Sequence, residues 1–120
     1  MDTGDGGRPR RGEIWLVDFD PAAGSEIAKR RPAVVVNDDA VGRLPLRIVV
    51  PITDWKERYG DFVWFTRLEP TIGNGLVKVS GADSFQVKSI SIRRFQRCVG
   101  RVTAWQMQNI VDAIALCIGS

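Results

Sequence analysis

Apolar and polar residues alternate along most of the first hundred positions, with the two-residue period of β-strands. In EIWLVDF, residues 13–19, Ile14 and Leu16 alternate with Trp15 and Val17 before the turn-forming DPAAGS. Similar apolar stretches separated by turn residues predict further strands at 32–37, 46–52, 61–66, 75–80, 85–92 and 98–102. The pattern therefore predicts a mostly β protein.

The pattern changes to a helical period at the C-terminus. Thr103 followed by Gln106 has the spacing of a capping box, and apolar residues then recur at helical spacing at Met107, Ile110, Val111, Ile114 and Ile118. One amphipathic α-helix is expected here. Many short strands with a single terminal helix predict a small, strongly bent antiparallel sheet or half-open barrel, whose apolar face the helix covers.

Length and composition predict a single domain. A chain of 120 residues is long enough for one hydrophobic core and too short for two. Residues 1–11 are rich in glycine and arginine and have almost nothing apolar to bury, so we expect them to form a flexible basic arm. Residues 12–120 then make the domain, with no internal repeat.

The charge is basic, and most of it is arginine. Of 17 cations 13 are arginine, whose planar fork suits phosphate, although the net charge is only +3. This balance fits nucleic acid, membrane headgroups or an acidic protein partner equally well. The placement is more informative, because Lys29, Arg30 and Arg31 stand together at the start of the strand predicted at 32–37.

Several kinds of chemistry are missing from the sequence. There is no histidine, which removes the commonest general base and metal ligand, and no phosphate-binding glycine motif occurs. The neighbouring Asp38 and Asp39 fit a turn better than a magnesium site. We expect no metal and no cofactor. Arginine, hydroxyl and amide groups remain, and arginine can stabilise the charge that develops in phosphoryl-ester chemistry.

The cysteines and the lengths of the apolar stretches indicate the expected cellular location. Cys98 and Cys117 lie in apolar sequence without C-x-x-C spacing, so they are predicted to be reduced core residues, with a disulfide or a reactive thiol as the alternative. No apolar run approaches the roughly 18 residues that span a bilayer, and the N-terminus lacks the apolar centre of a signal peptide. A cytoplasmic protein without a membrane segment is expected.

Four segments, in order, resemble one family. They are RGEIWLVDFDP at 11–21, GSEIAKRRPAVVVND at 24–38, IVVPIT at 48–53 and QVKSISIRRF at 86–95. Together they resemble the MazF/PemK family of toxin endoribonucleases over most of the chain. The resemblance implies an SH3-like barrel with a terminal helix, a homodimer, and the toxin role in a type II toxin-antitoxin system. It also implies metal-independent cleavage of single-stranded RNA (mRNA) by 2′-hydroxyl attack to a cyclic phosphate, and an acidic antitoxin partner.

The same motifs carry the candidate site residues. Arg31, in the R-P pair before the valines, takes the place of the family's catalytic arginine, and Thr53, after VVPI, takes the place of its catalytic threonine. A guanidinium and a hydroxyl could together stabilise a phosphorane. The resembling loops also supply RNA-binding candidates, namely Ser25, Glu26, Lys29, Arg30, Trp55, Gln86 and Lys88. The chain departs from many members at Ile27, at Lys29-Arg30, at Phe85 and at Lys88-Ser89.

Other interpretations stay open for these residues. Arg31 could be a solvated cation at a strand edge, and Thr53 could bond only its own backbone. Most of the tryptophans fit core or dimer packing, whereas Trp55 follows Thr53 in a polar loop and could stack on a base. A further set of arginines could be a solvated rim or a second phosphate track, namely Arg93, Arg94, Arg97 and Arg101. The alternative functions are a gyrase poison that cuts nothing and an RNA-binding module on the same fold.

Overall fold

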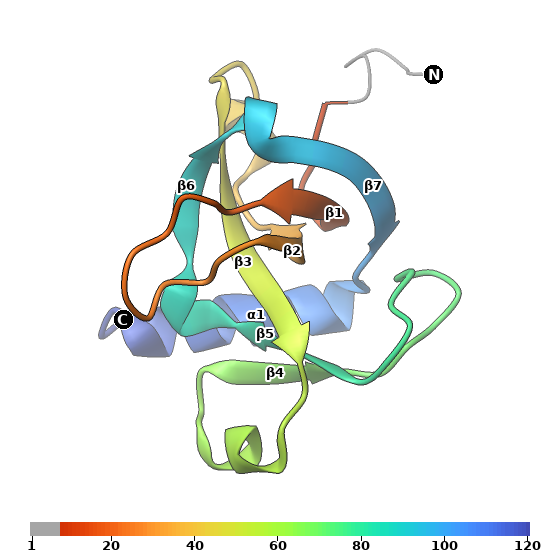
Figure 1. Ribbon diagram of the computed structural model, residues 1–120, viewed down its shortest axis with the longest axis vertical. Helices are drawn as coiled ribbons and strands as arrows, with labels where there is room; N and C mark the ends of the chain where they lie inside the picture. Colours follow the sequence, from red (N-terminus) through yellow and green to blue (C-terminus); the bar gives the residue numbers. More distant parts are fainter. Residues whose placement is uncertain (1–7) are drawn as a thin grey trace.

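A computed structural model describes residues 8–120, which form an antiparallel sheet and one helix (Figure 1). The elements are β1 (Glu13–Asp18), β2 (Arg30–Val35), β3 (Leu46–Asp54), β4 (Phe65–Leu68), β5 (Ser80–Asp83), β6 (Lys88–Ser91), β7 (Phe95–Arg101) and α1 (Ala104–Cys117). The sheet order is β4-β5-β3-β2-β1-β7, and β6 also pairs with β3. The predicted mostly β fold with a terminal helix is confirmed, as a bent sheet that does not close into a barrel.

The bend is centred on β3, the longest strand, which runs from top to bottom in Figure 1. Its first half pairs with β6, from Leu46 opposite Ser91 to Val49 opposite Lys88. Its second half pairs with β5, where Thr53 lies opposite Gly81. A single strand therefore joins two parts of the sheet, and its two ends lie at different surfaces of the molecule.

Both faces of the sheet are covered. Along β2 the buried residues alternate, so that Val34 packs with the cluster under α1 while Ala33 and Val35 pack on the opposite face. The helix buries Met107 and Ile110 in the first cluster. Its N-terminus carries the predicted capping box, in which the Gln106 N–H donates to Thr103 Oγ1 at 3.0 Å and the Thr103 N–H donates to Gln106 Oε1 at 2.9 Å.

Two predicted strands were misplaced in the middle of the chain. The stretch 61–66 was predicted as a strand, but a 3-10 turn at Glu57–Asp61 comes first and β4 begins only at Phe65. Aromatic packing explains the shift. The rings of Tyr59 and Phe65 stack at 3.9 Å, so the apolar side chains of this stretch pack around a turn and not along a strand. The strand predicted at 75–80 is mostly loop, and β5 begins at Ser80.

Two further strands have different bounds. The prediction for 85–92 is correct only for Lys88–Ser91, because 3-10 turns flank β6 on both sides. The last strand, predicted at 98–102, begins earlier, at Phe95, and includes part of the basic segment. Phe95 packs edge-on against Trp15 of β1 at 5.9 Å, which extends the pairing of β7 with β1.

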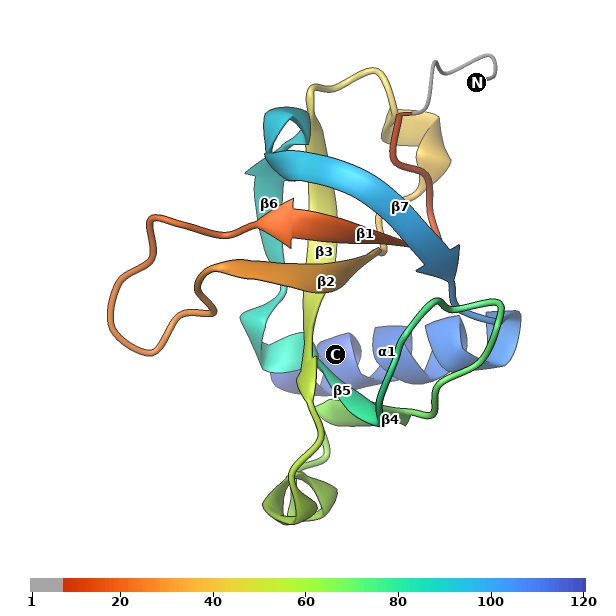
Figure 2. The same ribbon diagram turned by 45° about the vertical axis from the view of Figure 1, so that its right-hand side comes forward.

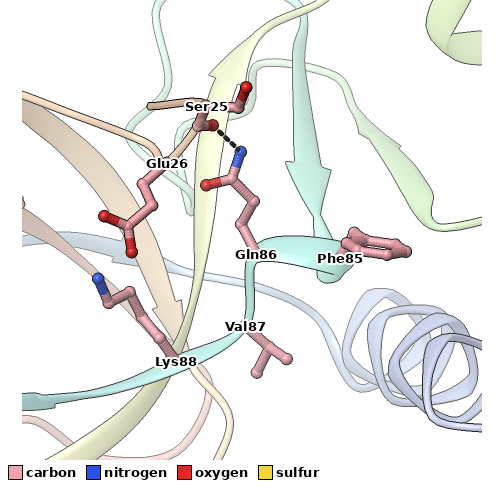
Figure 3. Close-up of a pocket in the computed structure, with 6 residues that line it drawn as sticks. All are labelled: Ser25, Glu26, Phe85, Gln86, Val87 and Lys88. Atoms are coloured by element: carbon pink, nitrogen blue, oxygen red, sulfur yellow. Dashed lines mark hydrogen bonds between the residues drawn. The ribbon is translucent and has the colours of Figure 1, made fainter. Parts of the chain in front are cut away.

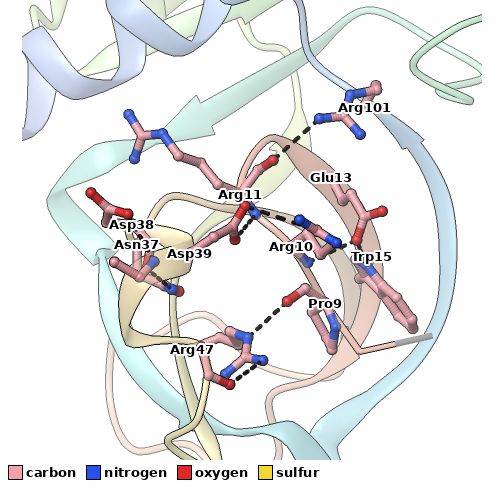
Figure 4. Close-up of polar contacts among 12 residues, drawn as sticks. Pro9, Arg10, Arg11, Glu13, Trp15, Asn37, Asp38, Asp39, Arg47 and Arg101 are labelled. Atoms are coloured by element: carbon pink, nitrogen blue, oxygen red, sulfur yellow. Dashed lines mark hydrogen bonds and ion pairs between the residues drawn. The ribbon is translucent and has the colours of Figure 1, made fainter. Parts of the chain in front are cut away.

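The end of the predicted arm is ordered. The Arg10 N–H donates to Glu13 Oε1 and the Arg11 N–H donates to Asp39 Oδ1, both at 2.8 Å, while the Pro9 carbonyl accepts from Arg47 Nε at 2.8 Å. Figure 4 shows this group of contacts beside the start of β1. The rest of the predicted arm, residues 1–7, lies outside the described residues.

Some predictions of burial were wrong. Cys98, predicted in the core, is exposed on β7, and Cys117 is only partly buried; both are free thiols. Trp105 is 74% exposed on α1, so it does not pack in the core of this chain. No helix within residues 8–120 is long and apolar enough to cross a membrane.

Candidate functional site

Arg31 and Thr53 meet across neighbouring strands. Arg31 lies near the start of β2 and Thr53 near the end of β3, and the two strands pair antiparallel. Arg31 Nη1 donates a hydrogen bond to Thr53 Oγ1 at 3.3 Å, and Arg31 Nε donates to the Ala28 carbonyl at 3.1 Å. Both side chains are half-buried. The structure therefore brings together the two residues that the sequence predicted as catalytic, which are 22 positions apart.

This geometry leaves hydrogen-bond donors available. A guanidinium has five N–H groups, and within residues 8–120 Arg31 uses only its Nε and Nη1 nitrogens, so that Nη2 has no partner there. Thr53 Oγ1 accepts from Arg31, and its own hydroxyl hydrogen therefore points elsewhere. An anion placed against this pair could accept bonds from both a guanidinium and a hydroxyl.

The loop that precedes β2 is closed just before Arg31. The Phe19 N–H donates to the Lys29 carbonyl at 2.9 Å, and the Lys29 N–H donates to Asp20 Oδ1 at 2.8 Å. Lys29 adopts φ of 68°, a left-handed conformation that is uncommon for a residue with a Cβ. These contacts make the chain turn sharply into β2. Figure 2 shows the loop extending beyond the sheet on one side of the molecule.

A pocket of about 430 Å³ lies against this loop (Figure 3). Its lining comes from this loop and from the segment that leads into β6, namely Ser25, Glu26, Phe85, Gln86, Val87 and Lys88. Four of these six are predicted RNA-binding candidates, since Phe85 and Val87 are not. In Figure 3 the Lys88 ammonium and the Glu26 carboxylate point toward each other. The two segments, about sixty residues apart in sequence, therefore form one surface.

The two aromatic side chains nearest the candidate residues differ in their surroundings. Trp55 is half-buried, with Tyr59 edge-on at 5.8 Å and the Arg67 guanidinium over its ring at 5.5 Å. Its ring face is therefore occupied within the chain. Phe85 is instead 64% exposed on the pocket wall, with Trp64 against its edge at 5.5 Å. The sequence singled out Phe85 only as a departure from the family, because exposure is not visible in a local pattern.

The other basic residues divide into two groups. Lys29 and Arg30 are exposed beside Arg31, whereas Arg93, Arg97 and Arg101 are exposed on or beside β7. Arg94 is half-buried, and its Nη1 donates to the backbone carbonyls of Asp18 at 3.1 Å and of Asp20 at 2.5 Å. Arg94 therefore supports the base of the loop and does not belong to a solvated rim.

One acidic residue near the site was not recognised from the sequence. Asp83 is buried at the end of β5, and burial raises the pKa of its carboxyl above the ordinary value. A hydrogen bond from the Phe85 N–H to Asp83 Oδ1, at 3.1 Å, opposes part of that shift. Asp83 thus caps the turn that carries Phe85 and Gln86.

Comparisons with known proteins agree with this fold and indicate the family. Endoribonuclease MazF9 of Mycobacterium tuberculosis is 37% identical over 113 residues, which are 89% of this chain and 93% of that protein. Endoribonuclease PemK of Escherichia coli is 50% identical over 44 residues, 36% of this chain and 33% of that protein.

Solved structures show the same fold. A crystal structure of MazF from Deinococcus radiodurans has a TM-score of 0.79 at 22% identity, covering 93% of this chain and 97% of that chain. An endoribonuclease from a mycobacterial species, in complex with its cognate antitoxin, has a TM-score of 0.72 at 18% identity, covering 92% and 95%. The profile of the PemK-like, MazF-like toxins matches residues 10–118. The chain therefore belongs to the PemK-like, MazF-like toxin family of type II toxin-antitoxin systems.

Proposed function

We propose that this chain is a toxin endoribonuclease that cleaves single-stranded RNA, mRNA in particular, without a metal ion. The observation that carries the proposal is the hydrogen-bonded pair of Arg31 and Thr53, found at the predicted positions in a chain of this family. Its 37% identical relative is named an endoribonuclease. This name disfavours the alternatives of a gyrase poison and of a module that only binds RNA.

The reaction is an attack of a ribose 2′-hydroxyl on the neighbouring phosphate. The 2′-oxygen bonds to phosphorus as the bond from phosphorus to the 5′-oxygen breaks, which leaves a 2′,3′-cyclic phosphate and a 5′-hydroxyl. The negative charge on the phosphorane oxygens increases during this step. Arg31 Nη2 and the Thr53 hydroxyl can donate to those oxygens, which stabilises the transition state more than the ground state.

Glu26 is assigned to the proton of the 2′-hydroxyl. A carboxylate only accepts hydrogen bonds and repels phosphate, so Glu26 suits a hydroxyl better than the RNA backbone. It takes the 2′-hydroxyl proton, and water supplies a proton to the leaving 5′-oxygen. The chain has no histidine, and Glu26 is the carboxylate in the pocket lining.

The surroundings of the pair would hold the RNA strand. Lys29, Arg30 and Lys88 offer positive charge for phosphates, and the Ser25 hydroxyl offers a neutral donor. Phe85 offers an exposed ring on which an unpaired base can stack. Phe85 thus takes the stacking role first given to Trp55, whose ring face is covered by Arg67.

The same basic surface suits an inhibitor. A negatively charged segment of a cognate antitoxin could cover Lys29, Arg30 and Arg31 and thereby exclude RNA. A mycobacterial endoribonuclease of the same fold has been solved with its cognate antitoxin. Since mRNA is the substrate, the cytoplasm is the proposed site of action.

A homodimer is part of the proposal. Apolar side chains are exposed at the start of β3, where Leu46 is 45% and Ile48 is 42% exposed, and at the end of α1, where Ile118 is 71% exposed. Ile48 and Ile118 line one shallow apolar groove. Pairing of two copies would bury such a surface, and light scattering at micromolar concentration should give twice the mass of the chain.

The test of the activity uses purified protein and a mixed-sequence RNA in excess EDTA. Discrete fragments with cyclic phosphate ends are expected. A matched RNA with a single 2′-deoxy ribose on the 5′ side of the cleaved bond should stay intact at that bond, because the nucleophile is missing. Intact RNA across neutral pH, or cleavage of the 2′-deoxy substrate at the same bond, would contradict the proposal.

A further inference from the structure

Gln86 uses both ends of its side-chain amide on the loop between β1 and β2. Its Oε1 accepts from the Ile27 N–H at 2.5 Å, and its Nε2 donates to the Ser25 carbonyl at 3.1 Å. Figure 3 shows the amide of Gln86 pointing at the Ser25 backbone. An amide with two ends engaged on backbone groups has less capacity left to read a base. The predicted RNA-binding role of Gln86 therefore has a competing explanation.

Asp20 accepts a hydrogen bond from a later part of the same loop, at Lys29. Its Oδ1 accepts from the Lys29 N–H at 2.8 Å. That N–H belongs to the same planar peptide as the Ala28 carbonyl, which accepts from Arg31 Nε at 3.1 Å. The peptide between Ala28 and Lys29 is thus held on one side by Asp20 and receives the Arg31 guanidinium on the other.

The support of Asp20 itself comes from outside the loop. Arg94 Nη1 donates to the Asp20 carbonyl, and within the loop the Phe19 N–H donates to the Lys29 carbonyl at 2.9 Å, which joins the two ends of the loop. Arg94 and Gln86 both belong to the segment around β6, one on each side of that strand. A single segment therefore holds the loop at its base and near Ile27.

We propose that Asp20 and Gln86 are positioning residues, which hold the loop of residues 19–29 so that the Ala28 carbonyl orients the Arg31 guanidinium. Nε of Arg31 is fixed by that carbonyl, and the Nη groups then face Thr53 and the substrate phosphate. This inference rests on the function proposed for Arg31. It goes beyond that function because neither Asp20 nor Gln86 needs to touch RNA.

Substitutions of Asp20 and Gln86 can distinguish a role in positioning Arg31 from direct binding of RNA. Asp20→Ala removes the acceptor for the Lys29 N–H, whereas Asp20→Asn keeps an oxygen there and should rescue most of the loss. Gln86→Leu removes both amide contacts at similar volume. The matched controls are Asp61→Ala, at an exposed aspartate of the 57–61 turn, and Gln96→Leu, at an exposed glutamine of β7.

The kinetic readout is single-turnover cleavage at saturating RNA, with RNA affinity measured separately. Asp20→Ala and Gln86→Leu should each lower the saturating rate by at least about tenfold, since small errors of orientation are costly in catalysis. The RNA dissociation constant should change by less than about threefold. Weaker RNA binding with an unchanged saturating rate would instead make Gln86 an RNA contact and would overturn the proposal.

A second readout does not depend on cleavage. In amide hydrogen exchange, the Ile27 and Lys29 amides should lose protection in Gln86→Leu and Asp20→Ala respectively, and the Arg31 Nε–H signal should shift in an NMR spectrum of Asp20→Ala. Unchanged exchange and an unchanged Arg31 signal would refute the positioning role even in an active ribonuclease. If the wild type cleaves no RNA while these signals do change, the loop inference stands and the proposed function fails.

Discussion

Arg31 and Arg47 show how one sheet can hold the same residue type in two different environments. They lie on the neighbouring strands β2 and β3, Arg31 beside the end of β3 and Arg47 at its start. Arg31 is half-buried and makes two hydrogen bonds to described residues. Arg47 is 3% exposed and surrounded by backbone (Figure 4).

The donors of Arg47 are engaged by carbonyls. It donates to Pro9 at 2.8 Å, to Leu44 at 2.8 Å, to Leu46 at 2.7 Å and to Gly42 at 3.2 Å. These carbonyls replace the water that a buried guanidinium loses, and they connect three parts of the chain. Residue type and a place on this sheet therefore do not suffice to identify a functional arginine. What distinguishes Arg31, the proposed catalytic arginine, is the hydrogen-bond donor capacity left after folding.

The largest expected effect is on stability, at Arg47. Arg47→Met keeps most of the side-chain volume but leaves the buried Pro9 carbonyl and three partly buried carbonyls without their donor, so the free energy of unfolding should fall by about 3 kcal/mol. Urea unfolding measures this change. Cleavage per folded molecule should stay near the wild-type value. A loss of less than about 1 kcal/mol would mean that water or nearby groups replace the guanidinium.

The next effect is on catalysis, at Arg31. Arg31→Ala should reduce the saturating cleavage rate by at least about a hundredfold, because it removes a strong charge-stabilising donor, while the unfolding free energy changes little. Arg30→Ala, at the exposed neighbouring arginine, is the control and should affect RNA affinity more than rate. A variant without Arg31 that cuts RNA at nearly the wild-type rate would remove this residue from the site.

A substitution of Phe85 tests whether the pocket beside the loop before β2 binds RNA bases. Phe85→Ala should weaken RNA binding by about tenfold or more, since stacking on an aromatic ring contributes about 1–3 kcal/mol per base. Fluorescence anisotropy with a labelled RNA measures it, with each variant made in the slowly cleaving Arg31→Ala background. Trp105→Ala, at an exposed tryptophan of α1, is the matched control. Equal affinities of the two variants would argue against a stacking role.

Thr53 is expected to contribute less to catalysis than Arg31. Thr53→Ala should lower the cleavage rate by about tenfold, because one neutral hydrogen bond contributes only about 1 kcal/mol. The measurement is the same single-turnover assay. If the defect exceeded that of Arg31→Ala, the hydroxyl and not the guanidinium would dominate stabilisation of the transition state.

The smallest effect is the pH dependence that Asp83 adds at this end of the molecule. Burial raises its pKa, so between the ordinary carboxyl pKa of about 3.9 and the raised value the folded state binds more protons than the unfolded state. Stability from this group therefore falls as pH rises through that window, and the penalty persists above it. Asp83→Asn keeps an acceptor for the Phe85 N–H and should flatten this slope in thermal unfolding. A steeper slope would contradict the assignment.

Local patterns determined much of the architecture. The two-residue period located β1, β2 and β3, although β2 was predicted at 32–37 and lies at Arg30–Val35. The capping box at Thr103 placed the start of α1, because such signals depend on neighbours within a few positions. The motifs also singled out Arg31 and Thr53, because each has a fixed place in its motif, and the structure puts Arg31 near the start of β2 and Thr53 near the end of β3.

Tertiary structure decided the rest, because those features depend on contacts between distant segments. The apolar stretch before β4 became a turn once Tyr59 could stack on Phe65, and the accessible ring proved to be Phe85. The contact of Gln86 with Ser25 joins residues 61 positions apart, and Arg94 reaches 74 positions to Asp20. No local period records such pairings, because they form only when the sheet brings β6 beside the loop before β2.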